Sequence, residues 1–556
     1  MSRFEPLAFR QHFPLLLASR VNQQALVYFD NGATTQKPKK VIDSYQHFYQ
    51  SANANVHRSS HALSHMATQA FEKARDTVKT FIKAQQLTEI IWTKGTTEGI
   101  NLVAHSLARN LLKVGDEIVL SQSEHHANIV PWQLIAQQTG AVIKILPLAL
   151  DGRIDVTALD RIISSNTRLV CCAHISNVLG RINPIETIIA RAKQVGALTL
   201  IDGAQAVAHL PVDVQALDCD FYVFSAHKMF GPTGVGVLYG KEAVLNTMQP
   251  YQAGGEMIKS VSFEQETTFQ ELPFKFEAGT PNIAGVIAFA EAINFIQAFN
   301  FDDIIAYEQR LVAYCMQQLS TIAEVKFICQ GQPDIPVIAF TVEQHHSQDI
   351  ASALDQYGIA LRNGNHCAMP LMHYLAISGC LRISLSPYNT IAEIDFFIEK
   401  LRGIVQTQSI TAVDSDDKVK HDGYSSNDIV ELFSTIHSWD GRHRQIMLLA
   451  KKLVRLTAEQ RSSENTISGC ESAAWITACC DASGAFSFNA DSDAKIIRGL
   501  LVIILAAFEH KTAAEIKNFN IEGYFSQLGL LQHLSPSRGN GVKAIVKKIH
   551  HLVNLH

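Results

Sequence analysis

A lysine and an aspartate each follow a strand-like apolar run. Lys228 lies in the segment 225–232, just after the run 220–224, and Asp202 ends the run 197–201. At the ends of neighbouring strands, such a lysine forms a Schiff base with pyridoxal phosphate. The carboxylate keeps the pyridine nitrogen protonated, so that the ring acts as an electron sink. Singly, a surface lysine and a helix-capping aspartate are simpler interpretations, but together the two residues predict a pyridoxal phosphate enzyme.

Small and hydroxylated residues that could bind a phosphate precede a helical stretch. Residues 95–99 include Thr96 and Thr97 and come before the helical residues 100–107. A helix start offers backbone N–H groups and its positive dipole end to a phosphate. A threonine that only caps its helix is the alternative interpretation. Ser225 and His227, beside the lysine, could complete the phosphate site.

Histidines are grouped at two places. His125 and His126 are adjacent and point different ways, which makes them a poor metal pair, but one of them could stack on an aromatic cofactor ring; a polar loop is the alternative. His57, His61 and His65 are spaced four apart and would share one helix face. Because no carboxylate accompanies them at ligand spacing, the sequence predicts no metal site.

Three further residues could act on a substrate. Cys367 lies in the polar loop 361–370, where cationic and imidazole neighbours favour the thiolate. Arg382, on the apolar strand that follows, could grip a substrate carboxylate with two hydrogen bonds or form a structural salt bridge. Asn177 follows another strand and faces the predicted ligand edge of the sheet.

The elements that must position these residues form an α/β pattern. Residues 1–405 alternate apolar runs with amphipathic helical stretches, which predicts a mainly parallel sheet and, over about 300–405, a smaller α+β subdomain. Residues 406–425 are polar and acidic and are typical of a flexible linker. Residues 426–556 form a third, α+β unit, in which 485–488 resemble a sheet edge and the apolar stretch 499–508 a buried helix.

Composition narrows the classes of function. The 556 residues carry a net charge of −5, which gives no sign of a nucleic-acid or anionic-membrane partner. No signal peptide or membrane-spanning run is evident. The ten cysteines are therefore expected to be reduced, most of them as inert core residues, in a cytoplasmic protein.

The motifs of residues 1–405 resemble the group II cysteine desulfurases, which are fold-type I, pyridoxal phosphate-dependent members of the class V aminotransferase family. The most specific matching segments are 93–98, 124–128, 202–205, 225–228, 277–281 and 365–368.

The resemblance implies a role for each site residue. Lys228 holds the cofactor and moves protons, Asp202 pairs with the pyridinium nitrogen, and Gln205 hydrogen-bonds the phenolic oxygen. His125 stacks on the ring and assists proton transfer. The cofactor phosphate is held by Thr96, Thr97, Ser225 and His227, and by Thr280 of the neighbouring subunit in a homodimer. The cysteine substrate is held by Arg382 and Asn177, with His57 and Arg58 close by.

The resemblance also implies the reaction. The thiolate of Cys367 attacks the sulfur of L-cysteine, which leaves a persulfide on the protein and releases alanine. The family loop commonly reads Gly-His-His-Cys, whereas this chain has Asn365 in place of the first histidine. How the Cys367 proton is removed therefore stays open.

Residues 426–556 resemble the SufE-like sulfur acceptors that partner such desulfurases. The matching segments are 439–442, 464–475, 484–493, 497–500 and 534–541. Cys470 matches the acceptor thiol and Glu471 fits the family motif, whereas Ala474 departs from it. Sulfur is therefore expected to pass from Cys367 to Cys470 and on to an iron–sulfur scaffold or another acceptor.

Other interpretations are kept. A selenocysteine lyase or cysteine sulfinate lyase would share the fold and the cofactor, with less need for Cys367. The C-terminal unit could also be a docking module without persulfide chemistry at Cys470. Cys479 and Cys480 are expected at buried helix positions, with a resolving role left open.

Overall fold

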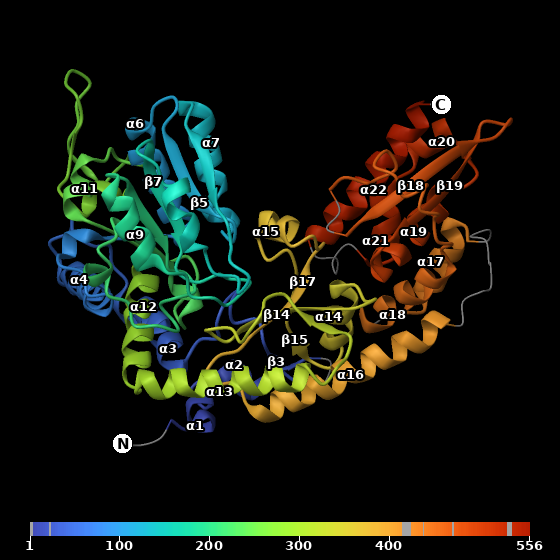
Figure 1. Ribbon diagram of the computed structural model, residues 1–556, viewed down its shortest axis with the longest axis horizontal. Helices are drawn as coiled ribbons and strands as arrows, with labels where there is room; N and C mark the ends of the chain where they lie inside the picture. The colour runs from blue at the N-terminus through green and yellow to red at the C-terminus, as the bar shows by residue number, and fades with distance from the viewer. Residues whose placement is uncertain are drawn as a thin grey trace. The chain divides into compact units, whose positions relative to one another are not determined.

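The computed structural model describes residues 4–21, 24–413, 424–436, 439–469, 472–530 and 536–555. These residues form two compact units (Figure 1). The first holds Met1–Thr341 and Tyr357–Glu399, and the second holds Val342–Gln356 and Lys400–His556. The second unit thus takes in a segment that lies within the predicted desulfurase region.

A mostly parallel sheet of seven strands lies at the centre of the first unit. Its order is β4-β10-β9-β8-β7-β5-β6, in which β10 runs antiparallel to β4 and β9, and the other pairs are parallel. The strands are β4 (Ile90–Thr93), β5 (Glu117–Ser121), β6 (Val142–Leu146), β7 (Thr167–Ala173), β8 (Leu198–Asp202), β9 (Phe221–Ser225) and β10 (Gly236–Gly240). This sheet confirms the predicted α/β fold.

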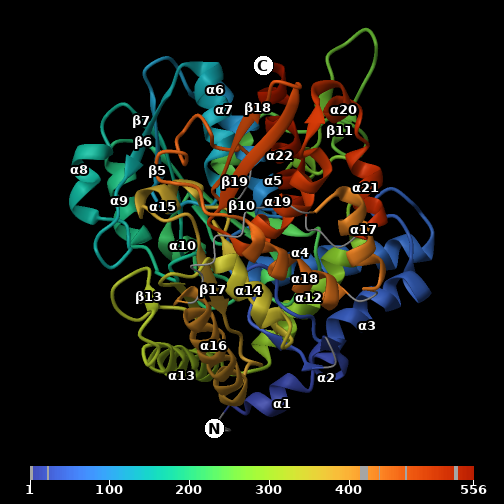
Figure 2. The ribbon, with the colours of Figure 1, turned by 90° about the vertical axis from the view of Figure 1, so that its right-hand side faces the viewer.

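Helices pack on this sheet and bury its strands. All residues of β9 are buried, which is why it appears in the sequence as a continuous apolar run. Helix α9 packs on β7 and β8, and α5 packs on β4, β9 and β10, while β5, β6 and β7 lie side by side (Figure 2). The main helices of this layer are α3 (Lys39–His47), α4 (Ala62–Phe81), α5 (Thr96–Val103), α7 (Val130–Thr139), α9 (Ile185–Gln194) and α12 (Ile283–Gln297).

A smaller sheet of order β13-β14-β17-β16 follows in the chain, as predicted for the α+β subdomain. Its elements and the helices near it in sequence are α13 (Phe301–Leu319), β13 (Val325–Phe327), β14 (Val337–Val342), α14 (Ser347–Asp355), β16 (Arg362–Gly364), α15 (Met369–Tyr374), β17 (Cys380–Ser384) and α16 (Ile391–Val413). Helix α16 covers residues 406–413 of the predicted linker, and residues 414–423 lie outside the described part of the chain.

Residues 424–555 of the second unit contain a three-stranded antiparallel sheet and several helices. The elements are α17 (Ser426–Ser434), α18 (Trp439–Leu449), β18 (Ala474–Cys480), β19 (Ala485–Ser492), α19 (Lys495–Phe508), β20 (Lys511–Thr512), α20 (Ala513–Asn518), α21 (Ile521–Gln527) and α22 (Pro536–Leu555). Helix α19 is buried from Ile496 to Phe508, which confirms the predicted buried helix. A Cβ on Gly499 would lie 2.1 Å from the Ile446 carbonyl oxygen, so glycine allows α18 and α19 to approach closely.

Strand β19 is central in this sheet, between β18 and β20. The prediction that residues 485–488 form a sheet edge was therefore wrong: an alternating strand pattern does not reveal how many neighbours the strand has.

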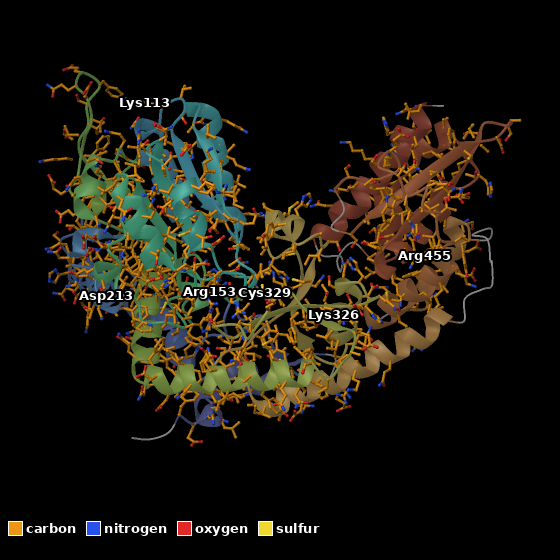
Figure 3. All side chains as sticks on the ribbon, in the orientation of Figure 1. Lys113, Arg153, Asp213, Lys326, Cys329 and Arg455 are labelled. Carbon is orange, nitrogen blue, oxygen red and sulfur yellow. The ribbon has the colours of Figure 1, made fainter. Side chains whose placement is uncertain are left out.

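The cysteines differ in exposure. Most of the described ones are buried, Cys329 and Cys367 are partly exposed (Cys329 is labelled in Figure 3), and Cys479 and Cys480 are exposed. The last two end strand β18, opposite Ser487 and Phe486. Their predicted burial in a helix was wrong, because the apolar run from Ala474 continues as a strand whose end projects from the core.

Among the described residues, no single helix is long and apolar enough to cross a membrane. The pair α12 and α13 passes that test only jointly, with a bend of 81° between the two helices.

Candidate active site

The ends of strands β8 and β9 in the large sheet and residues of β16 and β17 in the smaller sheet meet at one cavity of about 200 Å³. Asp202 and Ser225 end β8 and β9, and Lys228 closes the short 3-10 helix that follows β9. The predicted residues that line the cavity are Thr96, Thr97, His125, Asn177, Asp202, Gln205, Ser225, His227, Lys228, Cys367 and Arg382. His57, Arg58 and Thr280 do not line it, and Cys470 lies outside the described residues.

Eight lining residues were not predicted as site residues from the sequence. They are Gly32, Ala33, Ala127, Ala173, Ile175, Ala204, Arg362 and His366. The Asn31-Gly32 pair was a turn signal that could have drawn attention to Gly32. A Cβ there would lie 3.3 Å from Cζ of Arg382, so glycine leaves room for the guanidinium.

The amine of Lys228 is easier to deprotonate than an ordinary lysine. Burial is the largest cause and lowers the pKa of Lys228 from 10.5 to about 8, with Arg382 and Arg362 acting in the same direction. Asp202 opposes this shift, because its negative charge favours the ammonium form. The lysine is therefore prepared to act as a nucleophile and as a proton carrier near neutral pH.

Asp202 is a buried carboxylate in the same cavity. Burial raises its pKa, while the charge of Lys228 and a hydrogen bond of 2.9 Å from the Ala204 N–H to Oδ1 lower it. Gln205 donates a hydrogen bond from Nε2 to the Gly32 carbonyl at 2.8 Å, and this bond fixes the orientation of its side-chain amide.

The start of α5 meets the end of β9 at the place where the sequence predicts the phosphate site. The Thr96 N–H donates to Ser225 Oγ at 2.8 Å, and the two hydroxyl oxygens lie 2.7 Å apart. Backbone packing here is close: a Cβ on Gly236 would lie 2.4 Å from the Cα atom of Gly95. Burial lowers the pKa of His227 to about 4, with Lys228 contributing, so at pH 7 its ring is neutral and can donate one hydrogen bond.

His125 is also neutral. Burial lowers its pKa to about 3, with the charge of Lys228 next in effect. Nδ1 accepts a hydrogen bond of 3.1 Å from the Ala127 N–H, which places the ring proton on Nε2. A neutral ring held in this way suits stacking on an aromatic cofactor.

A buried carboxyl that sequence reasoning did not identify supports the His125 loop. Glu124 accepts hydrogen bonds from Ser121 Oγ, from Asn128 Nδ2 at 2.6 Å and from the Ala173 N–H at 2.9 Å. Burial raises its pKa to about 7. Asn128 in turn accepts from Trp132 Nε1 at 2.9 Å, so a connected polar network fixes the loop between β5 and α7.

The Cys367 loop is held by backbone hydrogen bonds. His366 and Cys367 have φ of 52° and 57°, in the left-handed region. The Asn177 Nδ2 donates to the His366 carbonyl at 2.8 Å, and the His126 N–H donates to the Cys367 carbonyl at 2.7 Å. Asn365 accepts from the Cys367 N–H at 3.0 Å through Oδ1, so this residue orients the thiol-bearing backbone.

Arg382 forms the structural salt bridge that was one of its two predicted roles. Its side chain is buried, donates to the Asn177 carbonyl at 2.9 Å and pairs with Asp30 at 3.1 Å. It also lines the cavity, and its Nε has no hydrogen-bond partner within the described structure. The arginine is therefore a structural ion-pair partner that also lies on the cavity wall, and its grip on a substrate carboxylate stays a prediction.

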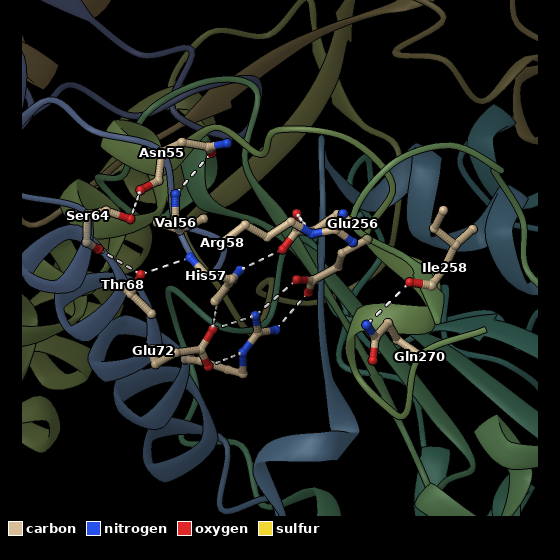
Figure 4. A network of polar contacts seen from close by, with 12 residues as sticks. Asn55, Val56, His57, Arg58, Ser64, Thr68, Glu72, Glu256, Ile258 and Gln270 are labelled. Carbon is tan, nitrogen blue, oxygen red and sulfur yellow. Dashed lines mark hydrogen bonds and ion pairs between the residues drawn. The ribbon is translucent and has the colours of Figure 1, made fainter. Parts of the chain in front are cut away.

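His57 and Arg58 lie in a separate polar network (Figure 4). His57 contacts Glu72 at 2.9 Å and Glu256 at 3.3 Å, and Arg58 contacts Glu256 at 2.8 Å. Within this chain, the two predicted substrate contacts are therefore engaged by glutamates outside the cavity.

Buried Arg75 connects that network to the loop that carries Thr280. It contacts Glu72 at 2.9 Å and holds both oxygens of Glu277 at 2.7 and 3.0 Å. Glu277 also accepts from the Trp92 N–H at 2.8 Å. The ion pair therefore anchors the segment before Thr280 to the edge strand β4 of the large sheet.

These residues fit pyridoxal phosphate. The cavity holds a lysine with a lowered pKa, a buried carboxylate and a neutral imidazole. A helix start with a glycine at Gly95 provides backbone N–H groups for a phosphate. Lys228 would bind the aldehyde carbon, and Asp202 would face the pyridine nitrogen.

Comparisons with known proteins identify the family of each part of the chain. The family model "Aminotransferase class-V" matches residues 27–397, and the model "Fe-S metabolism associated domain" (SufE) matches residues 427–553. A cysteine desulfurase of Yersinia pestis (strain Pestoides F) is 49% identical over 395 residues, 71% of this chain and 97% of that protein.

Solved structures give the same result. The cysteine desulfurase CsdA of Escherichia coli is 40% identical with a TM-score of 0.68, covering 73% of this chain and all of that one. A mutant of C-DES with glycine covalently linked to its PLP cofactor shares the fold at 23% identity and a TM-score of 0.62, covering 71% of this chain and 98% of that one. The resemblance, the fold class and the pyridoxal phosphate cofactor predicted from the sequence are thereby confirmed. The chain belongs to the class-V aminotransferase family, among its cysteine desulfurases, and carries a SufE domain behind the cofactor-binding region.

Proposed function

We propose that this protein converts L-cysteine to L-alanine and keeps the sulfur as a persulfide on Cys367. The observation that carries the proposal is the single cavity that joins Lys228, Asp202 and Cys367. A thiol in a loop fixed by backbone hydrogen bonds, next to the cofactor-binding residues, serves sulfur abstraction and is not needed for a simple transamination. The 49% identity to a cysteine desulfurase supports the same activity.

When bound, pyridoxal phosphate supplies an electron sink that weakens the bonds around the substrate Cα. Arg382 binds the substrate carboxylate, and Asn177 adds a polar contact. Lys228 removes and returns protons at the substrate carbon, and its lowered pKa makes both protonation states available near neutral pH.

Sulfur transfer is a displacement at the substrate sulfur. The Cys367 thiolate forms an S–S bond as the substrate C–S bond breaks. The bonding electrons stay with the carbon fragment, which takes up protons and leaves as alanine. The persulfide sulfur then passes to Cys470 and outward to iron–sulfur cluster assembly or another sulfur-using pathway.

We assign residues 1–405 to the desulfurase domain, with a small subdomain over about 300–405, and residues 426–556 to the acceptor domain. The matches of the two family models over 27–397 and 427–553 support this division. The protein is proposed to work in the cytoplasm.

A homodimer through the large domain completes the proposal. Thr280 lies outside the cavity of its own chain, and in the dimer it reaches the phosphate of the neighbouring site. Complementation tests this: a mixture of Lys228→Ala and Thr280→Val proteins should regain activity, because one site of each mixed dimer has both native residues. No gain on mixing would contradict sharing of Thr280.

Mass spectrometry after brief exposure to L-cysteine tests the reaction and the relay. We expect one added sulfur on the Cys367 and Cys470 peptides of the wild type and none on Cys470 in Cys367→Ser. Cys479→Ser, which removes an exposed thiol of the same domain, is the matched control and should keep both modifications. Sulfur on Cys367 alone would leave the C-terminal domain as a docking module.

The same variants distinguish the related lyase activities. If Cys367→Ser retained full alanine release from selenocysteine or from cysteine sulfinate while losing it from cysteine, the protein would also act as a lyase that does not require the thiol.

A further inference from the structure

The N-terminus of α19 receives its cap from a distant segment of the chain. The residue before the helix, Ala494, makes no side-chain hydrogen bond to the first turn. The N–H groups there have no partner within the helix, and a buried helix start needs acceptors for them. Because Ala494 and Ile496 are buried, water cannot serve this purpose well.

Asp349 of α14 supplies the acceptors. Its Oδ2 accepts from the Lys495 N–H at 3.0 Å and its Oδ1 from the Ile496 N–H at 3.4 Å. The side chain is 3% exposed. Asp349 stands in the first turn of its own helix, where an acidic residue ordinarily serves that helix, but here its carboxylate lies at the positive end of α19.

Two neighbours of Asp349 contact the same region. The Ser472 Oγ donates to Gln348 Oε1 at 3.2 Å, and both residues are buried. His346 Nε2 lies 3.8 Å from a carboxylate oxygen of Asp493, two positions before the first residue of α19. One turn of α14 therefore contacts both ends of the segment that connects residue 472 with α19.

The surroundings of α19 favour a negatively charged partner. Lys451, Arg455 (labelled in Figure 3) and Arg498 all act on Lys495 with like charge, and Asp349 is the residue whose charge opposes them most strongly. The carboxylate thus meets an excess of positive charge as well as a helix dipole.

We propose that the first turn of α14, with Asp349 at its centre, is the docking site for the acceptor domain of the same chain. The segment Val342–Gln356, which contains this turn, belongs to the same compact unit as the SufE region. Ser472 follows Cys470 by two positions in the sequence, so the contact of Ser472 with Gln348 joins a residue near the acceptor thiol in the chain to a segment of the region that the class-V model matches. The consequence for sulfur transfer rests on the proposed function.

Hydrogen exchange of the full-length holoenzyme tests the docking itself. We expect Asp349→Ala to raise exchange in the first turn of both α14 and α19, whereas the core strand β18 stays protected. Asp349→Asn, which keeps an acceptor oxygen, should have a smaller effect. Asp303→Ala removes an acid from the equivalent turn of α13 and is the matched control, with no change expected in α19. Unchanged exchange in Asp349→Ala would overturn the proposal.

Single-turnover sulfur transfer tests the consequence. In Asp349→Ala, persulfide should form on Cys367 at the wild-type rate, and its passage to Cys470 should slow by at least about fivefold, the equivalent of one lost helix cap. Equal transfer rates would overturn the coupling. If wild-type protein never places sulfur on Cys470, the relay fails, while the exchange experiment still decides whether the domain docks.

A double variant separates docking from simple helix capping. Ala494→Ser gives α19 a cap of its own. In Asp349→Ala/Ala494→Ser, we expect exchange in the first turn of α19 to return toward wild type while transfer to Cys470 stays slow. If transfer recovered as well, Asp349 would be only a helix cap and the docking proposal would be wrong.

Discussion

The lowered pKa of Lys228 predicts an unusually reactive amine in the cofactor-free protein. Burial brings the pKa from 10.5 to about 8. At pH 8 about half of the Lys228 side chains are then neutral, against about 0.3% for a lysine with the ordinary value, so the neutral amine is about 150-fold more abundant. Because only the neutral amine attacks an aldehyde, this ratio is the expected gain in reactive amine of Lys228 over an ordinary lysine at pH 8.

Competitive labelling with acetic anhydride between pH 6 and 11 measures this pKa. The extent of acetylation of the Lys228 peptide should rise with a midpoint near pH 8. The same peptide in the denatured protein is the control and should have a midpoint near the ordinary lysine value of about 10.4.

Two charge variants test the assigned causes of this shift. Asp202→Asn removes the negative charge that raises the lysine pKa, so the midpoint should fall below that of the wild type. Arg362→Gln removes a positive charge that lowers it, so the midpoint should rise. A wild-type midpoint above about pH 10, or a rise in Asp202→Asn, would refute the reasoning.

Three further predictions concern stability, measured by urea unfolding. Gly236→Ala should cost about 1–3 kcal/mol, because its Cβ would lie 2.4 Å from the Gly95 Cα; unchanged stability would show that the strands can separate at this point. The pKa of Glu124 is about 7 in the folded protein and about 4.5 in the unfolded chain, so the folded state holds the proton more tightly. As the pH rises between these values, the free energy of unfolding of the wild type should therefore fall by up to about 3 kcal/mol relative to that of Glu124→Gln. Parallel pH profiles of the two proteins would contradict this. Arg75→Met should cost about 3–5 kcal/mol by leaving Glu277 buried without its ion pair, and a smaller loss in the double variant Arg75→Met/Glu277→Gln would confirm the cause.

Residues of the candidate site were predictable from the sequence because a buried strand is an apolar run that ends at a polar residue. Buried parallel strands appear as apolar runs, and polar residues directly after them must lie at the carboxyl edge of the sheet. Lys228, Asp202 and His125 could therefore be placed near one another before any contact was known, and all three line the cavity. The same regularity failed for Cys479, since a short apolar run does not distinguish a strand from a buried helix.

Contacts between residues far apart in the chain were decided by the tertiary structure alone. Asn177 and Arg382 are joined by a hydrogen bond although 205 positions separate them, and no local pattern encodes such a pairing. The cap that Asp349 gives to α19 is of the same kind. The tertiary structure also decides the side-chain pKa values. Burial is the largest cause of the pKa shifts of Lys228 and Glu124, and these side chains become buried only when the helices and strands pack. The sequence by itself thus determined which chemical groups this protein has and on which edge of the sheet they lie, whereas packing determined their partners and charge states.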